Sequence, residues 1–210
     1  YNPEGKSIEA EIIDYRDGNV TLNRKGDGRG KVIKVPLASF DLETREYLRR
    51  WAVRQSAIRD LRLEKDRESV RIGNTKQVYY KVMLHNRSAL PMDQLEMRYI
   101  LHKGLDHPSD YLPAFEVTDE QWRIDGDESL PVLQAGGDDT ARTGEMQLHE
   151  RIFQRITYNL DGTYSVDTKT RWEDIEGLWV GIYHEGVLVN ELAEPRSLSQ
   201  IDRDALGSRY

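Results

Sequence analysis

Apolar and polar residues alternate in short runs over the first part of the chain, which is the spacing of strands with one buried face. Residues 8–12 (IEAEI), 20–22 (VTL) and 32–35 (VIKV) are three such runs, because successive side chains of a strand point to opposite faces. Asp17-Gly18 between the first two predicts a tight hairpin turn, since glycine adopts positive φ without a steric penalty. Pro36 is expected to end the third strand, because it lacks a backbone donor.

A helix is predicted directly after these strands, from Asp41 to about Arg54. Asp41 is well placed as its N-cap, because a carboxylate accepts hydrogen bonds from the free amides of a first turn. Leu48, Trp51 and Ala52 recur at i, i+3 and i+4, which gives the helix one apolar stripe.

Residues from 58 onward indicate strands joined by turns. Ile58, Leu61 and Leu63, with residues 70–72 (VRI), predict a first strand pair or one long bent strand. Residues 78–84 (VYYKVML) and 95–101 (LEMRYIL) have the β-branched and aromatic content of central strands. From about 103 to 143 Gly, Pro and Asp predominate, so we expect a long loop there, with one short strand near 122–124 and a mobile GGDD segment at 136–139.

Alternation resumes beyond residue 145. Residues 146–148, 152–153 and 156–158 indicate strands, with a helix over 145–154 as the alternative. Asp161-Gly162 predicts a turn into a strand at 164–166, and His184-Glu185-Gly186 predicts the turn between strands at 178–183 and 187–189. Pro195 is expected to close the last strand, and residues 197–206 to form a short helix or a disordered tail.

This pattern predicts a mainly β protein of two domains, residues 1–57 and 58–210. The second domain has about seven strands and no alternation of strands with helices, which favours an antiparallel sandwich of the immunoglobulin or fibronectin type.

The first domain resembles a known family. Residues 8–12 (IEAEI), 17–22 (DGNVTL) and 31–37 (KVIKVPL), with Tyr47-Leu48 beyond them, are similar in order and spacing to the first Sla-type homology domain, an SH3-like module of a yeast endocytic adaptor and of bacterial envelope proteins. The resemblance covers about a quarter of the chain. It implies a small non-enzymatic barrel for protein contacts. Val32 aligns with a lysine that the adaptor uses to bind Asn-Pro-Phe peptides, so that specificity is not carried over.

Composition narrows the function classes. The 210 residues include 30 Lys and Arg against 37 Asp and Glu, for a net charge of −7, and no cysteine. Disulfides, thiolate metal sites and cysteine nucleophiles are therefore excluded. Residues 1–57 carry 11 basic and 9 acidic residues and residues 58–210 carry 19 and 28, which supports the division into two domains. No run approaches the roughly 18 apolar residues of a transmembrane helix. A start at Tyr1 rather than methionine leads us to expect a mature or truncated form of an exported bacterial protein.

Several stretches look like known sites only at first glance. Residues 25–31 (KGDGRGK) lack the spacing and the Ser or Thr of a phosphate-binding loop, and we expect a hairpin loop there. His102, Asp106 and His107 are expected to be polar residues of a surface loop rather than zinc ligands. Residues 125–128 (DGDE) do not fit an EF-hand, and we expect a solvated turn. Asn86-Arg87-Ser88 matches a glycosylation sequon.

No compact catalytic signature occurs in the sequence. It has no Gly-x-Ser-x-Gly elbow, and no pair of carboxylates stands out for glycoside hydrolysis. The most basic segment distributes Arg45, Arg49, Arg50 and Arg54 around the helix, so no focused patch for nucleic acid is expected. We therefore expect a protein without enzymatic activity and without a cofactor.

We expect a protein-interaction or assembly function in an exported or cell-envelope system, through a protein partner or self-association. Tyr79, Trp179 and Tyr183 are predicted to face outward with a solvated polar end, as aromatic residues do at protein contacts. With Lys34 and Arg49 they are the candidate contact residues. The alternative is a secreted carbohydrate-binding or carbohydrate-active protein, in which tryptophan and tyrosine side chains, Trp122 and Trp179 among them, stack on sugar rings.

Overall fold

The chain divides into two compact units, residues 1–60 and residues 61–210. The structure is a computed structural model that describes residues 9–24, 31–105, 110–113 and 122–196. The described part is mainly β, with several antiparallel sheets and one α-helix. The predicted loop at 25–31 lies outside this part except for Lys31, and the predicted tail at 197–206 lies outside it entirely.

The first unit is a three-stranded antiparallel sheet in the order β1-β2-β3, followed by a short 3-10 helix and the α-helix. Its elements are β1 (Ala10–Arg16), β2 (Asn19–Arg24), β3 (Lys31–Pro36), η1 (Leu37–Ser39) and α1 (Leu42–Asp60). The three predicted strands are confirmed. A small core joins the strands to the helix, and its buried residues are Val20, Leu22, Leu37, Phe40 and Leu48.

The helix begins where the sequence predicts and ends later. Asp41 is the N-cap: its Oδ1 accepts the Thr44 N–H at 2.7 Å, and this bond holds the pKa of Asp41 below its ordinary value. The expected end near Arg54 is wrong, because α1 continues to Asp60. Residues 55–60 contain no glycine or proline that would break it. Ile58, predicted in a strand, therefore lies in the helix.

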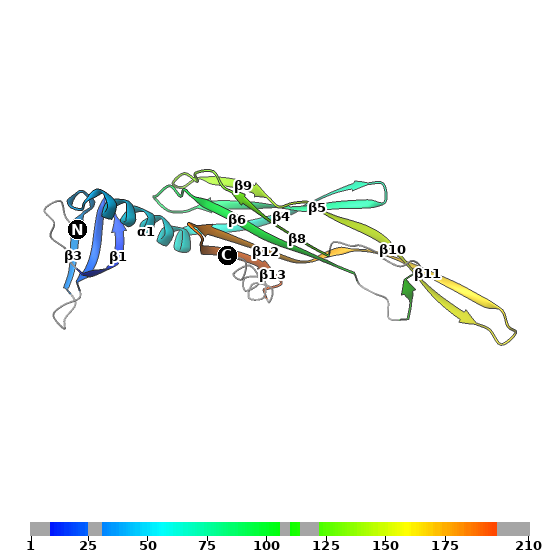
Figure 1. Cartoon of the computed structure of the whole chain (residues 1–210). Helices are drawn as coiled ribbons and strands as arrows, with labels where there is room; N and C mark the ends of the chain where they lie inside the picture. Colours follow the sequence, from blue (N-terminus) through cyan, green and yellow to red (C-terminus); the bar gives the residue numbers. More distant parts are fainter. Residues whose placement is uncertain (1–8, 25–30, 106–109, 114–121, 197–210) are drawn as a thin grey trace. The chain divides into compact units, whose positions relative to one another are not determined.

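The second unit holds two antiparallel sheets whose strands run along each other in Figure 1. In one sheet the order is β11-β10-β5-β4, with β7 paired to β10 and β9 to β5, and in the other it is β13-β12-β6-β8. The strands of the first sheet are β4 (Leu61–Ile72), β5 (Thr75–Asn86), β7 (Leu112–Pro113), β9 (Asp138–Arg142), β10 (Met146–Tyr158) and β11 (Tyr164–Trp172). Those of the second are β6 (Leu95–Gly104), β8 (Arg123–Ser129), β12 (Asp174–His184) and β13 (Val187–Glu194).

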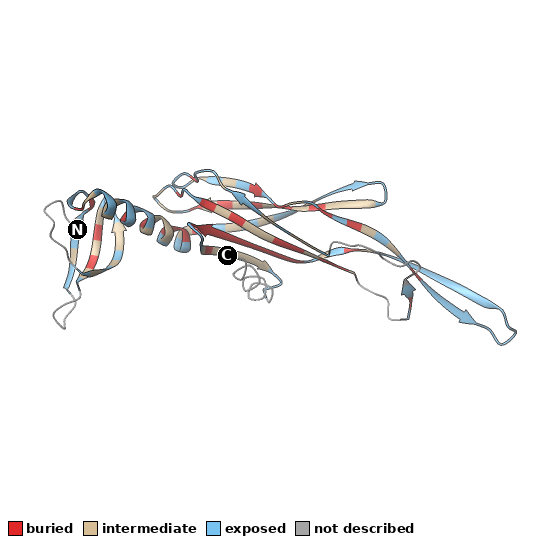
Figure 2. Cartoon of the chain, in the orientation of Figure 1, coloured by how far each residue is buried: buried red, intermediate tan, exposed pale blue. Residues whose placement is uncertain are grey.

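Burial follows the strand period. In β5 every second residue from Val78 to Asn86 is buried, while those between are half-buried. In β12 all residues from Gly177 to His184 are buried, and Figure 2 shows this strand as the longest buried stretch. The core of the second unit therefore lies along β5 and β12, one central strand from each sheet.

Two hairpin turns form as predicted. Asp17 and Gly18 have φ of 52° and 70°, and Glu185 and Gly186 have φ of 50° and 75°. Two successive positive φ values are typical of the type I′ turn, whose twist matches that of the strands it joins. Asp161-Gly162 also forms a turn, between β10 and β11.

The segment expected to be a long loop contains more structure than predicted. Besides the strand near residue 122, which is β8 and runs to Ser129, it contains β7 and β9. The GGDD segment is not a mobile loop in the structure: Asn86 N–H donates to the Gly137 carbonyl at 2.9 Å, and Asp138 and Asp139 pair with β5. The pairing partner β5 is distant in sequence, so local composition did not reveal these strands.

At two segments the structure selects one of the two conformations that the sequence allows. Residues 61–72 form the single long strand β4, not a strand pair. Residues 146–158 form strand β10, not a helix, because both edges of this segment find strand partners, β5 for its first residues and β11 for the rest. Among the described residues, no helix is long and apolar enough to span a membrane.

Candidate functional site: the β10–β11 arm

The β10–β11 hairpin continues beyond the part of β10 that pairs with β5, and we call residues 150–172 the arm. Pairing with β5 ends at His149, and pairing with β11 runs from Glu150 to Tyr158. Figure 2 shows the far part of the arm as almost wholly exposed. The arm is therefore a two-stranded ribbon over most of its length.

The turn of the arm is held by hydrogen bonds among its own residues. Asp161 Oδ1 accepts the Thr163 hydroxyl at 2.6 Å and the Thr163 N–H at 2.9 Å, and these two bonds hold the pKa of Asp161 below its ordinary value. Asn159 N–H donates to the Thr163 carbonyl at 2.8 Å, and Gly162 supplies the positive φ of 83°.

One face of the arm is apolar and exposed. The register pairs Ile156 with Val166 and Tyr158 with Tyr164, so these side chains share a face with Ile152. Their exposed fractions are 42% for Ile152, 53% for Ile156, 77% for Tyr158, 66% for Tyr164 and 46% for Val166. The two tyrosine rings lie 6.3 Å apart between centroids. We call these five residues the apolar face of the arm.

Part of the opposite face is covered by the chain itself. Tyr111 is buried against it and its hydroxyl donates to Asp167 Oδ2. The Arg155 guanidinium and the Lys169 ammonium lie 5.2 Å and 4.3 Å from the centroid of the Tyr111 ring, and Phe153 is 1% exposed. The chain thus covers this face at Phe153, while other residues of the same face, such as Thr157 and Ser165, are polar and exposed.

A buried ion cluster holds the base of the arm. Glu173 follows β11 directly. Its carboxylate accepts hydrogen bonds from Lys103 Nζ at 2.9 Å, from Arg151 Nε at 2.7 Å and from the His149 N–H at 3.0 Å. Burial raises the pKa of Glu173, but these hydrogen bonds outweigh it and the pKa lies below its ordinary value. The carboxylate therefore ties β10 and β6 together where the arm leaves the sheets.

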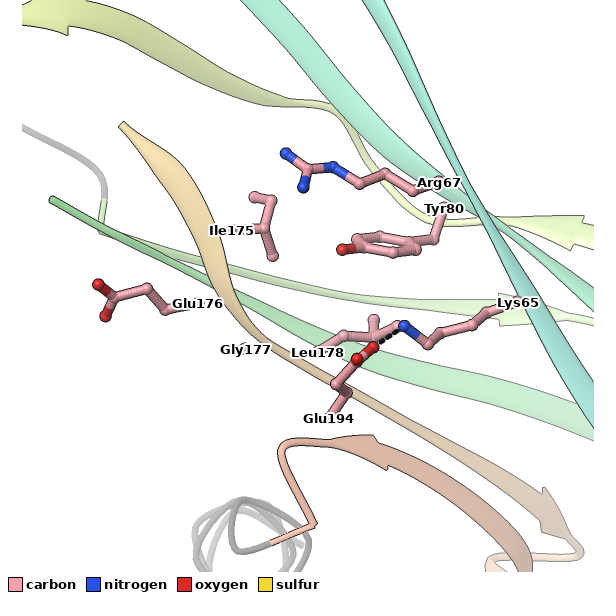
Figure 3. Close-up of a pocket in the computed structure, with 8 residues that line it drawn as sticks. All are labelled: Lys65, Arg67, Tyr80, Ile175, Glu176, Gly177, Leu178 and Glu194. Atoms are coloured by element: carbon pink, nitrogen blue, oxygen red, sulfur yellow. Dashed lines mark ion pairs between the residues drawn. The ribbon is translucent and has the colours of Figure 1, made fainter. Parts of the chain in front are cut away.

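A hollow of about 300 Å³ lies elsewhere in the second unit, between β4, β5 and β12. Figure 3 shows the Lys65 ammonium paired with Glu194 at its edge, while the Glu176 carboxylate points away from it. Arg67 pairs with Asp174. Both basic groups of the hollow are already paired with carboxylates of the chain, so neither is a free cationic anchor for a small ligand.

The predicted contact residues do not form one site. Lys34 on β3 and Arg49 on α1 are exposed residues of the first unit. Tyr79 on β5 is half-buried, with the Arg142 guanidinium carbon 3.6 Å from its ring centroid and its hydroxyl 3.3 Å from Glu68 Oε2.

The expectation that Trp179 and Tyr183 face outward is wrong. Trp179 is 0% exposed and Tyr183 is 8% exposed. The Trp179 indole lies over Gly181, where an added Cβ would come within 2.5 Å of Cη2, and its Nε1 donates to Glu191 Oε2 at 3.0 Å. The absence of a side chain at Gly181 therefore makes room for the ring against the sheet.

Other candidate residues also lie differently from the sequence-based expectation. His102 is in strand β6 rather than in a loop, while Asp106 and His107 lie outside the described residues. Residues 125–128, expected as a turn, belong to β8. Within the described part of the chain, no group of three or more His, Asp or Glu residues could hold a metal ion.

The Asn86 sequon is closed in the folded chain. Asn86 is 0% exposed, and its amide donates to the carbonyls of Leu90, Leu133 and Gln134 at 2.7, 3.2 and 2.9 Å. A glycan replaces one of the two hydrogens of this nitrogen, so it would break part of this network and need space that a fully buried side chain does not have. The side chain is a structural link between two loops.

Sequence reasoning placed strands at the arm but missed its open face. The signal was present: Ile156 and Tyr158 precede the Asp161-Gly162 turn, and Tyr164 and Val166 follow it at matching positions. Each run alone predicts one buried face. Only the tertiary structure shows that Phe153 is buried on one face, while the five residues of the apolar face stay exposed.

No family model matches the chain, and no curated protein matches it. Among solved structures, an X-ray structure of a Northeast Structural Genomics Consortium target is similar at a TM-score of 0.24, with 9% sequence identity, over 55% of this chain and 85% of that chain. A similarity this weak carries no argument about fold or function.

Proposed function

We propose that this protein is a non-enzymatic interaction or assembly protein, which contacts a protein partner through the apolar face of the arm. The observation that carries the proposal is the exposure of five large apolar or aromatic side chains on a single face of a two-stranded ribbon. Contiguous exposed apolar surface of this kind marks interaction sites, since leaving it in water forgoes the stabilisation that burial provides.

The composition of the face fits a protein partner. It combines branched aliphatic residues with two tyrosines, and tyrosine is enriched at protein interfaces because its ring buries apolar area while its hydroxyl stays hydrated. The open face of a ribbon can also pack against a sheet of a partner, as sheets pack face to face in β-sandwiches.

The wider setting of the proposal comes from the sequence. The Sla-type resemblance of residues 8–48 favours an SH3-like contact module in the first unit, and an immunoglobulin-like sandwich is the arrangement we propose for the second. The same resemblance favours an exported or cell-envelope location in a bacterium. Lys34 and Arg49 remain candidate contacts of the first unit, because their side chains are exposed.

A glycan-binding function has less support. Its expected platform included Trp179, whose ring is buried. Trp122 is 43% exposed, but the Lys103 ammonium lies 5.2 Å from its ring centroid, so one face of this indole is taken.

A site-specific photocrosslinker tests the proposed contact surface. We expect p-benzoylphenylalanine at position 156, on the apolar face, to form covalent adducts with another polypeptide in cells that naturally contain the protein. The same residue at position 157 provides the matched control, because Thr157 is also exposed and lies one residue along the same strand on the opposite face.

Adducts from position 156 with few or none from position 157 are the expected result. Equal yields from the two positions, or no adduct from either, would show that the apolar face is not a contact surface. A second measurement uses Ile156→Glu, which should abolish the adducts formed from a crosslinker at position 164, whereas Thr157→Glu should leave them unchanged.

A further inference from the structure

We propose that two copies of this chain pair with each other along β11, to form a continuous four-stranded antiparallel sheet from their arms. This inference rests on the proposed function, because it names a second copy of the chain as a partner of the same arm. The contact it describes, however, is the edge of β11 rather than the apolar face.

The outer edge of β11 has no strand partner within the described part of the chain. β11 is the last strand of its sheet, with β10 as its one neighbour among the described strands. Edge strands present unpaired N–H and C=O groups that readily pair with another chain. The edge from Tyr164 to Trp172 is nine residues long and has no proline or glycine to interrupt such pairing.

The turn of the arm decides which residues of β11 offer these groups. Asn159 N–H bonds to the Thr163 carbonyl, and hydrogen-bonded pairs alternate with non-bonded pairs along an antiparallel ladder. Odd-numbered residues of β11 therefore bond to β10, while even-numbered residues direct N–H and C=O outward. The outward set is Tyr164, Val166, Thr168, Thr170 and Trp172.

The sequence of β11 is complementary to itself about Thr168. With a two-fold axis at Thr168, Asp167 of each copy lies opposite Lys169 of the other. The same register places Val166 opposite Thr170 and Tyr164 opposite Trp172. By symmetry, the dimer would contain two opposite-charge pairs and two aromatic pairs. Such cross-strand pairs stabilise antiparallel strands.

Neighbouring registers are disfavoured by the same charges. An axis moved to Asp167 places two carboxylates opposite each other, and an axis moved to Lys169 does so with two ammonium groups. An axis between two residues would place even-numbered residues of one copy opposite odd-numbered residues of the other. The N–H and C=O groups of the odd-numbered residues already bond to β10, so the ladder could not form. Within the chain, the Asp167 carboxylate accepts the Tyr111 hydroxyl, lies 3.5 Å from Arg155 and also interacts with the Thr168 N–H, so the ammonium of the other copy would meet a carboxylate that is already held in place.

Pairing would also give the arm the support that it lacks alone. A two-stranded hairpin by itself is only marginally stable in water. Independent stability generally needs three or more strands with an apolar face. Because even-numbered residues pair with even-numbered residues, the apolar faces of the two arms would lie on the same side. The pair would then present one apolar platform twice as wide as that of a single arm.

Cysteine crosslinking tests the pairing directly, because the natural chain has no cysteine. Thr168→Cys places the two sulfurs on the two-fold axis, in a pair whose Cα atoms are about 5.5 Å apart, which is within the range of a disulfide. Ser165→Cys is the matched control on the same strand, with its equivalents about 20 Å apart at 3.4 Å per residue. We expect mild oxidation of the full chain to give a covalent dimer from Thr168→Cys and little from Ser165→Cys.

A charge-exchange experiment provides an independent test. Asp167→Lys places lysines opposite lysines, and Lys169→Asp places aspartates opposite aspartates. We expect each variant alone to dimerise roughly ten- to a hundredfold more weakly than the wild type in analytical ultracentrifugation. An equimolar mixture restores opposite charges at both positions, so it should form heterodimers with near wild-type affinity. An arm that had merely unfolded would not be rescued in this way.

The outcomes separate this inference from the proposed function. Wild-type protein that stays monomeric at high concentration, equal disulfide yields at positions 165 and 168, or variants that associate no better when mixed would each overturn the pairing of β11. If adducts from position 156 with a different polypeptide persist in those cases, the proposed function still stands. Loss of those adducts together with the dimer would overturn both.

Discussion

A single carboxylate, Glu173, links three parts of the second unit. The side chain of Glu173 is 0% exposed, and that of its ion-pair partner Lys103 is 3% exposed. A buried charge is tolerated only when it is paired and hydrogen-bonded, and Glu173 receives two cationic side chains and one backbone amide. The stability of the base of the arm therefore depends strongly on this residue.

We predict that Glu173→Gln lowers the free energy of unfolding of the second unit by about 3–5 kcal/mol, because it leaves the buried Lys103 without its counter-charge. Glu145→Gln is the control: Glu145 pairs with Arg142 at the surface, and such pairs contribute about 1 kcal/mol or less. Urea unfolding measures both, through the midpoint at unchanged slope. Equal shifts in the two variants would contradict the assigned role of Glu173.

The pH dependence of this effect has a defined sign. The pKa of Glu173 lies below its ordinary value in the folded chain, so its contribution is fully present above the unfolded value of about 4.3. That contribution is lost as the pH falls through the folded pKa. We therefore predict that the difference in stability between wild type and Glu173→Gln is constant near neutral pH and shrinks on acidification below about pH 4.3. A difference that grows in acid would be inconsistent with a lowered pKa.

At the scale of elements, the helix and the arm depend on different interactions. α1 is started by a local signal, the Asp41 cap, and only four of its residues are buried. The arm has a local turn at Asp161, but its register is also fixed at the base by Glu173 and on one face by Tyr111. Local changes should therefore act on the helix and on the arm in different ways.

We predict that Asp41→Ala destabilises the start of α1 by about 0.5–2 kcal/mol, since the Thr44 N–H loses its acceptor. Asp41→Asn should cost much less, because asparagine caps helices about as well as aspartate. Amide hydrogen exchange of peptides from residues 42–52 measures the change. The prediction would be wrong if the two variants exchanged at the same rate.

At the scale of the whole molecule, each unit has its own buried residues. The core of the first unit includes Leu48, and that of the second includes Leu84 on β5. We predict that Leu48→Ala, at a cost of about 2–5 kcal/mol, accelerates hydrogen exchange in residues 10–56 and leaves residues 75–105 unchanged, while Leu84→Ala does the reverse. Identical effects of both substitutions throughout the chain would indicate a single cooperative unit instead.

Features that depend on neighbouring residues were predictable from the sequence. The strands at 78–84 and 178–183, the turns at Asp17-Gly18 and Glu185-Gly186 and the cap at Asp41 all arise from alternation, positive φ or a side-chain acceptor within a few residues. These interactions are local, so a short stretch of sequence contains all the groups that they need. The mainly β character of the chain follows from them.

Features that depend on residues distant in sequence were decided only by the tertiary structure. β9 forms because it pairs with an edge of β5, a strand more than 50 residues earlier in the sequence. The loop-like composition of residues 136–139 gave no sign of this strand. Trp179 is buried because Gly181 leaves space for its ring, and Phe153 is buried on one face of the arm while Ile156 and Tyr158 on the other face are exposed. Alternation along a strand indicates that its two faces differ, but the packing of distant segments decides which side chains are covered and which stay exposed.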